Sequence, residues 1–311
     1  MFENQLTLKK KITFNGLGLH CGLPIKMTVL PSEIDTGIYF VRTDLKKSLP
    51  IEANWKNIIP ANLCTKISNK KNQYVSTIEH LMFALYSLGI SNALIEVNGP
   101  EVPIMDGSAK IFIEELLKNG LLEQNKKNKK IKIFKTFEVK IGNKHIIYQP
   151  ASAEGLEIDY VIKYNDQFIK EQSFILKNAQ TNFLQVYDSR TFCHQEDLEK
   201  IFAMGLAKGG SLENAIVISA NKILNQEGLR YQNEFVRHKV LDCLGDLYLC
   251  NFFLSGKIIC KQGGHELTSL LLAKIFENDK YYTVEDFTAS NNDQTTKKSG
   301  YINRVERVVS N

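Results

Sequence analysis

One stretch of the chain, residues 235–253 (FVRHKVLDCLGDLYLCNFF), restricts the fold more than any other. Its apolar residues recur at steps of three and four, which predicts an amphipathic helix with a buried face. His238, Asp242 and Asp246 are four residues apart and therefore lie along one side of this helix. An imidazole and a carboxylate one turn apart can supply two ligands to a divalent cation, and a catalytic site needs a third. The alternative is an exposed ion pair at helical spacing.

A second helix is predicted over residues 74–89 (YVSTIEHLMFALYSLG), with an apolar stripe and a glycine at its end. Glu79 and His80 fall in its first turn, where the helix dipole disfavours a protonated imidazole and leaves His80 able to bind a metal. The alternatives are a capping box formed by Ser76 and Glu79 and a hydrogen-bonded histidine at a helix start. The residues of this segment alone favour these alternatives.

The composition is that of an ordinary globular protein, with 43% hydrophobic and 23% charged residues and a net charge of +5. This mild excess of positive charge permits an anionic ligand, but without a nucleic-acid-binding motif it predicts no nucleic acid partner. No apolar run is long enough for an integral membrane segment, and residues 1–14 lack the features of a secretory signal. None of the six cysteines forms a CxxC pair, so we expect a cytoplasmic protein with free thiols.

Strands and helices are expected in both halves of the chain, without a regular alternation of strand and helix. We therefore predict an α+β fold of two related two-layer domains. Each domain is a β-sheet with helices, the helices pack between the two sheets, and the active site lies at the domain interface. The domains are expected at residues 1–122 and 133–289, with a lysine-rich linker at 123–132 and a polar tail at 290–311.

A glycine-rich segment, residues 16–22 (GLGLHCG), lies between two predicted strands. Its third glycine comes one place too late for the dinucleotide-binding fingerprint GxGxxG, and no helix follows. The segment is therefore not a Rossmann-type loop. Considered alone, His20 is interpreted as a turn residue.

Several motifs occur together in one order along the chain: GLGLHCG, LCT at 63–65, TIEH, PIMDGSA, SRTF, FVRHKVLD and GGH. Through this ordered set of motifs the chain resembles the UDP-3-O-acyl-N-acetylglucosamine deacetylases, the zinc enzymes of lipid A synthesis known as LpxC. The resemblance extends from about residue 5 to about residue 285, and the polar C-terminal tail has no obvious counterpart.

The resemblance implies a catalytic metal centre with one Zn²⁺ per chain and one position open for water. Fe²⁺ accepts the same types of ligand and is the alternative metal. The ligands carried over from the family are His80, His238 and Asp242. The implied catalytic residues are Glu79 as general base, His265 as general acid or oxyanion stabiliser, Asp246 as the residue that orients His265, and Thr191 as a donor to the oxyanion.

The implied substrate is UDP-3-O-(3-hydroxyacyl)-N-acetylglucosamine, from which the enzyme would release acetate in the committed step of lipid A biosynthesis. The residues carried over as contacts to the sugar and diphosphate are Lys239, His20, Lys144, Phe192 and Leu63. An apolar passage for the acyl chain would include Leu198, Ala207, Leu212 and Val217, which without the resemblance are interpreted as ordinary core residues. A monomer is expected.

Three departures from the family's usual motifs are visible. Cys193 and His194 follow RTF where Gly-Phe is common, Cys21 takes a Thr position, and Lys208 and Asn214 add polarity near the expected acyl passage. None of these positions is a proposed ligand or the proposed base.

Two other functions remain as alternatives. A different zinc amidohydrolase or a peptidase would use the same kinds of ligand, although the HExxH motif of zincins is absent. A non-catalytic basic binding module would have no use for a base and an acid around a metal. The joint presence of Glu79, His265 and Asp246 therefore favours an enzyme.

Overall fold

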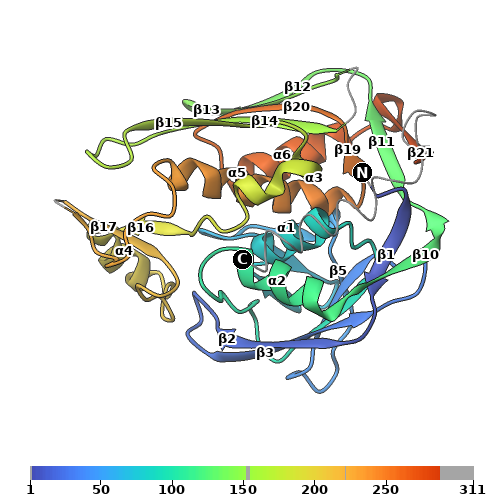
Figure 1. Cartoon of the computed structure of the whole chain (residues 1–311), viewed down its shortest axis with the longest axis horizontal. Coiled ribbons are helices and arrows are strands. Elements are labelled where there is room, and N and C mark those ends of the chain that lie inside the picture. Colours follow the sequence, from blue (N-terminus) through green and yellow to red (C-terminus); the bar gives the residue numbers. More distant parts are fainter. Residues whose placement is uncertain (1, 152–154, 221, 288–311) are drawn as a thin grey trace.

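Two five-stranded sheets form the outer layers of the computed structural model, which describes residues 2–151, 155–220 and 222–287 (Figure 1). The tail expected at 290–311 lies outside the described residues. The first sheet has the spatial order β2 (Ile12–Leu17), β3 (Pro24–Pro31), β9 (Ala93–Val97), β4 (Ile38–Arg42) and β5 (Ile51–Glu52). The second has the order β12 (Phe137–Ile141), β13 (Lys144–Gln149), β20 (Gly256–Lys261), β14 (Leu156–Lys163) and β15 (Glu171–Leu176).

The two sheets repeat one topology. In each, the first three strands are antiparallel neighbours, the fourth runs parallel to the third, and the fifth is antiparallel to the fourth. The parallel pair in each sheet is joined through a helix that precedes its later strand. The predicted α+β fold of two related domains is therefore confirmed, although the relation is one of topology.

The strands form where apolar residues alternate with polar ones. In β14 the side chains of Leu156, Ile158, Tyr160 and Ile162 are buried, while the residues between them are partly exposed. This period of two places one face of the strand on the core. The hairpin of β12 and β13 turns through the two residues 142–143, a Gly-Asn pair of the kind that favours a two-residue turn.

Helices fill the space between the sheets (Figure 1). The central pair, α1 (Glu79–Leu88) and α5 (Glu234–Leu247), pack against each other, and every residue of α1 is buried. They are accompanied by α2 (Lys110–Asn119), α6 (His265–Ile275) and the short α3 (Ala179–Asn182). Single 3-10 turns lie at η1 (Trp55–Asn57), η2 (Phe183–Gln185), η3 (Gln195–Asp197), η4 (Tyr248–Cys250) and η5 (Asp279–Tyr281). None of the described helices is long and apolar enough to cross a membrane.

Both key helices are shorter than the sequence predicts. Residues Tyr74–Ser76 form strand β8, so that α1 begins only at Glu79, and α5 ends at Leu247. The capping-box alternative is wrong, because the Ser76 hydroxyl donates to the Pro100 carbonyl, 3.1 Å away. No side chain caps the start of α1.

Gly245 allows α1 and α5 to approach closely. A Cβ atom at this position would lie 2.1 Å from the carbonyl oxygen of Glu79 and 3.1 Å from the amide nitrogen of Phe83. We therefore expect Gly245→Ala to lower the free energy of unfolding by about 3 kcal/mol, because a backbone contact cannot yield as a flexible side chain does. Urea denaturation would measure the loss. Gly264→Ala is the control, since that position has open space and an extended backbone. Equal stability of the two variants would contradict the close approach.

Each domain carries a three-stranded insertion between its fifth strand and its central helix. The first consists of β6 (Ile58–Ile59), β7 (Lys66–Ser68) and β8, and the second of β16 (Phe192–His194), β17 (Ile216–Ser219) and β18 (Lys222–Ile223). The second also contains η3 and α4 (Leu198–Ala203), and it projects beyond the layers on the left of Figure 1. Both insertions carry residues that the sequence assigns to the site.

The segment 123–132, expected as a lysine-rich linker, is largely exposed but lies mostly in strands. It lies in β10 (Leu121–Lys127), which pairs with β1 (Asn4–Leu8), and in β11 (Lys129–Ile133), which pairs with β19 (Phe253–Leu254) and β21 (Tyr282–Asp286). Partner strands distant in the sequence supply the backbone hydrogen bonds, and exposed lysines are common on such outlying strands. The segment still joins the two halves, and the exact domain boundary stays a prediction.

Candidate active site

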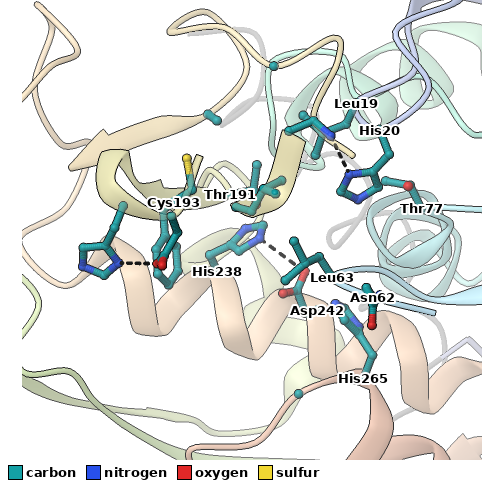
Figure 2. A pocket seen from close by; sticks show the side chains of 18 of the residues that line it. Leu19, His20, Asn62, Leu63, Thr77, Thr191, Cys193, His238, Asp242 and His265 are labelled. Carbon is teal, nitrogen blue, oxygen red and sulfur yellow. Dashed lines mark hydrogen bonds and ion pairs between the residues drawn. The ribbon is translucent and has the colours of Figure 1, made fainter. Parts of the chain in front are cut away.

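A cavity of about 860 Å³ lies where the two domains and their insertions meet (Figure 2). Its lining includes nearly all of the residues that the sequence assigns to the site, from His20 in the first half to His265 in the second. Asp246 is the exception, because it is buried behind His265. The structure thus brings together segments that are far apart in the chain.

Three potential ligand atoms converge on the floor of this cavity. His80 comes from the first turn of α1, while His238 and Asp242 come from successive turns of α5, and all three side chains are buried. The Oδ1 atom of Asp242 lies 3.4 Å from Nε2 of His80 and 3.3 Å from Nε2 of His238. His80 therefore offers the third potential ligand beside the α5 pair.

The chemistry of this group fits a bound cation. Nδ1 of His238 donates to the Ser189 carbonyl at 3.0 Å, and burial lowers the pKa of His238 to about 3, so its Nε2 is unprotonated and presents a lone pair. Oδ1 of Asp242 is buried and has no hydrogen-bond partner among the described residues. Such an orphaned carboxylate oxygen facing an imidazole lone pair is costly unless a positive charge lies between them.

The spacing of these atoms also matches a tetrahedral ion. Ligand atoms at about 2.0–2.1 Å from a tetrahedral centre lie about 3.3 Å from one another. The two separations from Oδ1 of Asp242 are 3.3 and 3.4 Å. Both separations from Asp242 therefore suit an ion of zinc's size, and all three ligand atoms lie within 4.8 Å of one another.

Lys239 neutralises the other oxygen of Asp242. Its ammonium donates to Oδ2 at 2.7 Å, and this contact raises the pKa of Lys239 although burial acts in the opposite direction. For Asp242, burial opposes the charge, but His238 and Lys239 hold its pKa well below the ordinary range. Lys239, expected from the resemblance to approach the substrate, is thus already engaged in an ion pair at the floor of the cavity.

Glu79 lies beside this ligand group at the start of α1 and is 3% exposed. Burial raises its pKa to about 7, although the neighbouring His265 and His80 act in the opposite direction. Its Oε2 accepts the backbone N–H of Thr65 at 3.1 Å, and its Oε1 lies 3.9 Å from Nε2 of His265. A carboxylate with this pKa can accept a proton near neutral pH.

His265 begins α6 and faces Glu79 from the second domain. Nδ1 of His265 lies 2.7 Å from Oδ2 of Asp246, as the predicted orienting role requires. Burial alone would lower the pKa of His265, but Asp246 and Glu79 raise it to about 9. The imidazole is therefore protonated at neutral pH and can donate a proton from Nε2, which faces Glu79.

Thr191, labelled in Figure 2, and its neighbour Phe192 line the cavity from the second insertion. The backbone of Thr191 is fixed by its N–H, which donates to Gly107, and by its carbonyl, which accepts from Ile216. The ring of Phe192 lies edge-on to Phe235 and His238, with centroids 4.9 and 6.3 Å apart. Phe192 therefore packs against α5 and also lines the cavity.

His20 projects into the cavity from the glycine-rich loop, which is held by a buried carboxylate. Glu101 accepts hydrogen bonds from the backbone N–H groups of His20 and Cys21 and from the hydroxyl of Thr77. The Nδ1 atom of His20 faces the N–H of Ala207 at 3.4 Å. His20 is thus a fixed part of the cavity wall and not a simple turn residue.

Leu63 and Lys144 lie at the cavity's edge. Leu63 is 56% exposed and adopts a positive φ of 63°, which is unusual for a bulky residue. Lys144 begins β13 and is exposed. Both are accessible to a ligand that extends out of the cavity.

The second insertion forms an apolar branch of the cavity. Its lining from this insertion includes Leu198, Ile201, Phe202, Met204, Ala207, Leu212 and Val217. The alternative of ordinary core is wrong for Leu212, which is 43% exposed, whereas Val217 is buried in β17. Lys208 and Asn214 do not line the cavity. The Asn214 side chain instead bonds to Ser211 and Gly209 within its own loop.

Sequence reasoning missed two buried residues that organise the site. Thr65 bonds to Glu79, Asp246 and His265, and Glu101 holds the glycine-rich loop. The only signal for Thr65 is its place in the LCT motif. Cys193 and His194 contact the cavity, but the described residues place no metal-binding cluster there.

Comparison with known proteins agrees with this geometry. The sequence model of the family described as "LpxC: UDP-3-O-acyl N-acetylglycosamine deacetylase" matches residues 5–277. The chain belongs to this family. The match includes every residue that the sequence assigns to the site, from His20 to His265.

Curated relatives in the family are similar over nearly their whole length. The UDP-3-O-acyl-N-acetylglucosamine deacetylase of Haemophilus ducreyi is 40% identical, with 88% of this chain and 90% of the relative covered. The protein of the same name from Geobacter sp. is 41% identical, with coverage of 91% and 92%. That of Haemophilus influenzae is 36% identical, with coverage of 98% and 99%.

Proposed function

We propose that the protein hydrolyses the N-acetyl group of UDP-3-O-(3-hydroxyacyl)-N-acetylglucosamine, giving acetate and the free amine, the committed step of lipid A biosynthesis. Membership of the family supports the reaction and the substrate. The observation that supports this chemistry is that Glu79, His265 and the group of His80, His238 and Asp242 share one cavity. A different zinc amidohydrolase, acting on another acylated sugar, is the alternative.

The proposed metal is zinc, held by His80, His238 and Asp242. Two imidazoles and one carboxylate are typical zinc ligands, and the two separations from Asp242 suit such an ion. Fe²⁺ shares these ligand types and is the second candidate. When bound in such a site, zinc lowers the pKa of water and polarises a carbonyl group.

Glu79 and His265 would divide the proton transfers between them. Glu79 removes a proton from the attacking water as its oxygen bonds to the acetyl carbon. As the C–N bond breaks, His265 gives its Nε2 proton to the leaving amine, while Asp246 holds the ring through Nδ1. Thr191 would donate to the oxyanion of the tetrahedral intermediate.

The remaining cavity residues would bind the two ends of the substrate. Leu198, Ala207, Leu212 and Val217 form an apolar branch suited to an acyl chain. Lys144, exposed at the edge, is better placed for a phosphate than Lys239, whose ammonium is bound to Asp242. His20, Leu63 and Phe192 would contact the sugar and the groups attached to it.

Acetate release from UDP-3-O-(3-hydroxyacyl)-N-acetylglucosamine, with several acyl lengths, tests the proposed function. Release that is lost after chelation and recovered with Zn²⁺ would support both reaction and metal. A folded, metal-loaded protein that releases no acetate from any of these substrates would refute the reaction. Activity on another acylated sugar under the same conditions would favour the alternative.

The pH dependence of kcat/KM should be bell-shaped. The rate is expected to fall below pH 7, because Glu79, with a pKa of about 7, must be unprotonated to act as base. It is expected to fall above pH 9, because His265, with a pKa of about 9, must be protonated to act as acid. His265→Ala should abolish the alkaline limb and keep the acid limb. An unchanged alkaline limb in that variant would contradict the role of His265.

The proposal also covers the oligomeric state, the location and the domain division of the protein. We expect a monomer in the cytoplasm, where all six cysteines, which are unpaired in the structure, would stay reduced. The proposed domain division stays as predicted, near residues 123–132. Light scattering of the purified protein would test the monomer.

A further inference from the structure

We infer that Thr65 is a positioning residue that aligns the base and the acid of the reaction, and this inference rests on the roles proposed for Glu79 and His265. Thr65 lies just before β7 in the first insertion and is 4% exposed. It contacts Glu79 through its backbone and both Asp246 and His265 through its hydroxyl. Thr65 does not itself line the cavity, and no other residue in the described part of the chain bonds to all three of these side chains.

The backbone of Thr65 distinguishes the two oxygens of Glu79. Its N–H donates to Oε2 at 3.1 Å, which occupies that oxygen. The other oxygen, Oε1, faces Nε2 of His265 at 3.9 Å. The proton taken from water should therefore go to Oε1, on the side that faces the acid.

The hydroxyl of Thr65 fixes the orientation of His265. It has one hydrogen, which it donates to Oδ1 of Asp246 at 2.5 Å, since an ionised carboxylate can only accept. Its oxygen is then left to accept from Nδ1 of His265, 3.1 Å away. Nδ1–H is shared between Thr65 and Oδ2 of Asp246, 2.7 Å away. This arrangement keeps the proton of Nδ1 in place and presents Nε2 to Glu79.

These bonds cross the boundary between the two halves of the chain. Thr65 and Glu79 belong to the first half, whereas Asp246 and His265 lie on α5 and α6 of the second. Thr65 therefore links the proposed base and acid across this boundary and helps to fix the distance between them. A displacement of about 1 Å in such a pair can cost about a hundredfold in rate.

The test compares two small replacements that differ by one oxygen, Thr65→Ser and Thr65→Ala. We expect Thr65→Ala to lower kcat by about a hundredfold with little change in KM, and Thr65→Ser to stay within about threefold of the wild type. Both keep the backbone N–H that binds Glu79. Metal content should stay the same in both. Thr65→Val adds a replacement of nearly equal volume and should behave like Thr65→Ala.

The matched control is Thr7→Val. The Thr7 hydroxyl is also buried and bonds to Asn92 and Ser32, but it lies in β1, outside the cavity. This control measures how much the loss of a buried hydroxyl lowers the thermal midpoint without touching base or acid. We expect Thr7→Val to lose stability and to keep its kcat.

Other results would overturn either the role of Thr65 or the proposed function itself. Equal kcat for Thr65→Ala and Thr65→Ser, or a fall in Thr65→Ala no larger than in Thr7→Val, would overturn the role of Thr65. So would a loss of activity that follows a loss of metal. An inactive wild type would refute the proposed function itself. If Thr65→Ala and Thr65→Val do not fold, a Thr65→Ser variant with a kcat lowered about a hundredfold would equally overturn the role of the hydroxyl.

Discussion

Glu79→Gln is expected to lower kcat by about a thousandfold while the metal content stays at the wild-type value. Glutamine keeps an oxygen that can accept the N–H of Thr65, as Oε2 of Glu79 does. It cannot take a proton from water, so the step that the carboxylate assists loses its base. Acetate release and metal content measured on the same preparation would give both quantities.

The control for this variant is Glu266→Gln. Glu266 is an exposed residue of the same cavity, so its replacement changes the charge equally without removing the proposed base. We expect only a small change in kcat there. If Glu79→Gln kept a kcat similar to that of Glu266→Gln, Glu79 would not be the base, and His265 would have to be considered for both proton transfers.

His238→Ala is expected to remove both the metal and the activity. The variant leaves one ligand on α5 and one on α1, which are too few for a stable site. It also leaves the buried Oδ1 of Asp242 without its nearest imidazole partner. Metal content should fall from one ion per chain towards zero, and kcat by at least about a thousandfold. Elemental analysis and acetate release measure the two losses.

His145→Ala is the matched histidine control. His145 lies in β13 and does not line the cavity, so its loss should change neither quantity. Chelation of the wild type should reproduce the loss seen in His238→Ala, and added Zn²⁺ should restore the wild type only. A His238→Ala protein that keeps one ion per chain would show that the ion is held elsewhere.

The sequence predicts the elements that repeat regularly and the residues that belong to motifs. The helical periodicity around His238 and around His80 indicates α5 and α1 correctly, because both helices bury apolar residues at regular steps. The spacing of His238 and Asp242 places them on one side of α5, as the structure shows. The alternation in residues 156–163 likewise predicts β14.

The features that the sequence did not reveal are contacts between residues that are distant in the chain. The lysine-rich residues 123–132 form strands because β1 and β21 lie beside them, and no local pattern predicts such pairing. The same is true of Thr65, whose importance comes from Asp246 and His265 in the other half. Lys239 could be placed near the substrate by resemblance, but its ion pair with Asp242 appears only in three dimensions.

The two repeated halves meet at the cavity, and the three ligand atoms are divided between them. His80 belongs to the first repeat, and His238 and Asp242 belong to the second. An ion that binds all three is a cross-link between the repeats, and its binding free energy adds to the free energy that holds them together. With the proposed metal bound, folding, domain association and metal loading would be thermodynamically linked, and scarcity of the metal would weaken the same interface that forms the cavity.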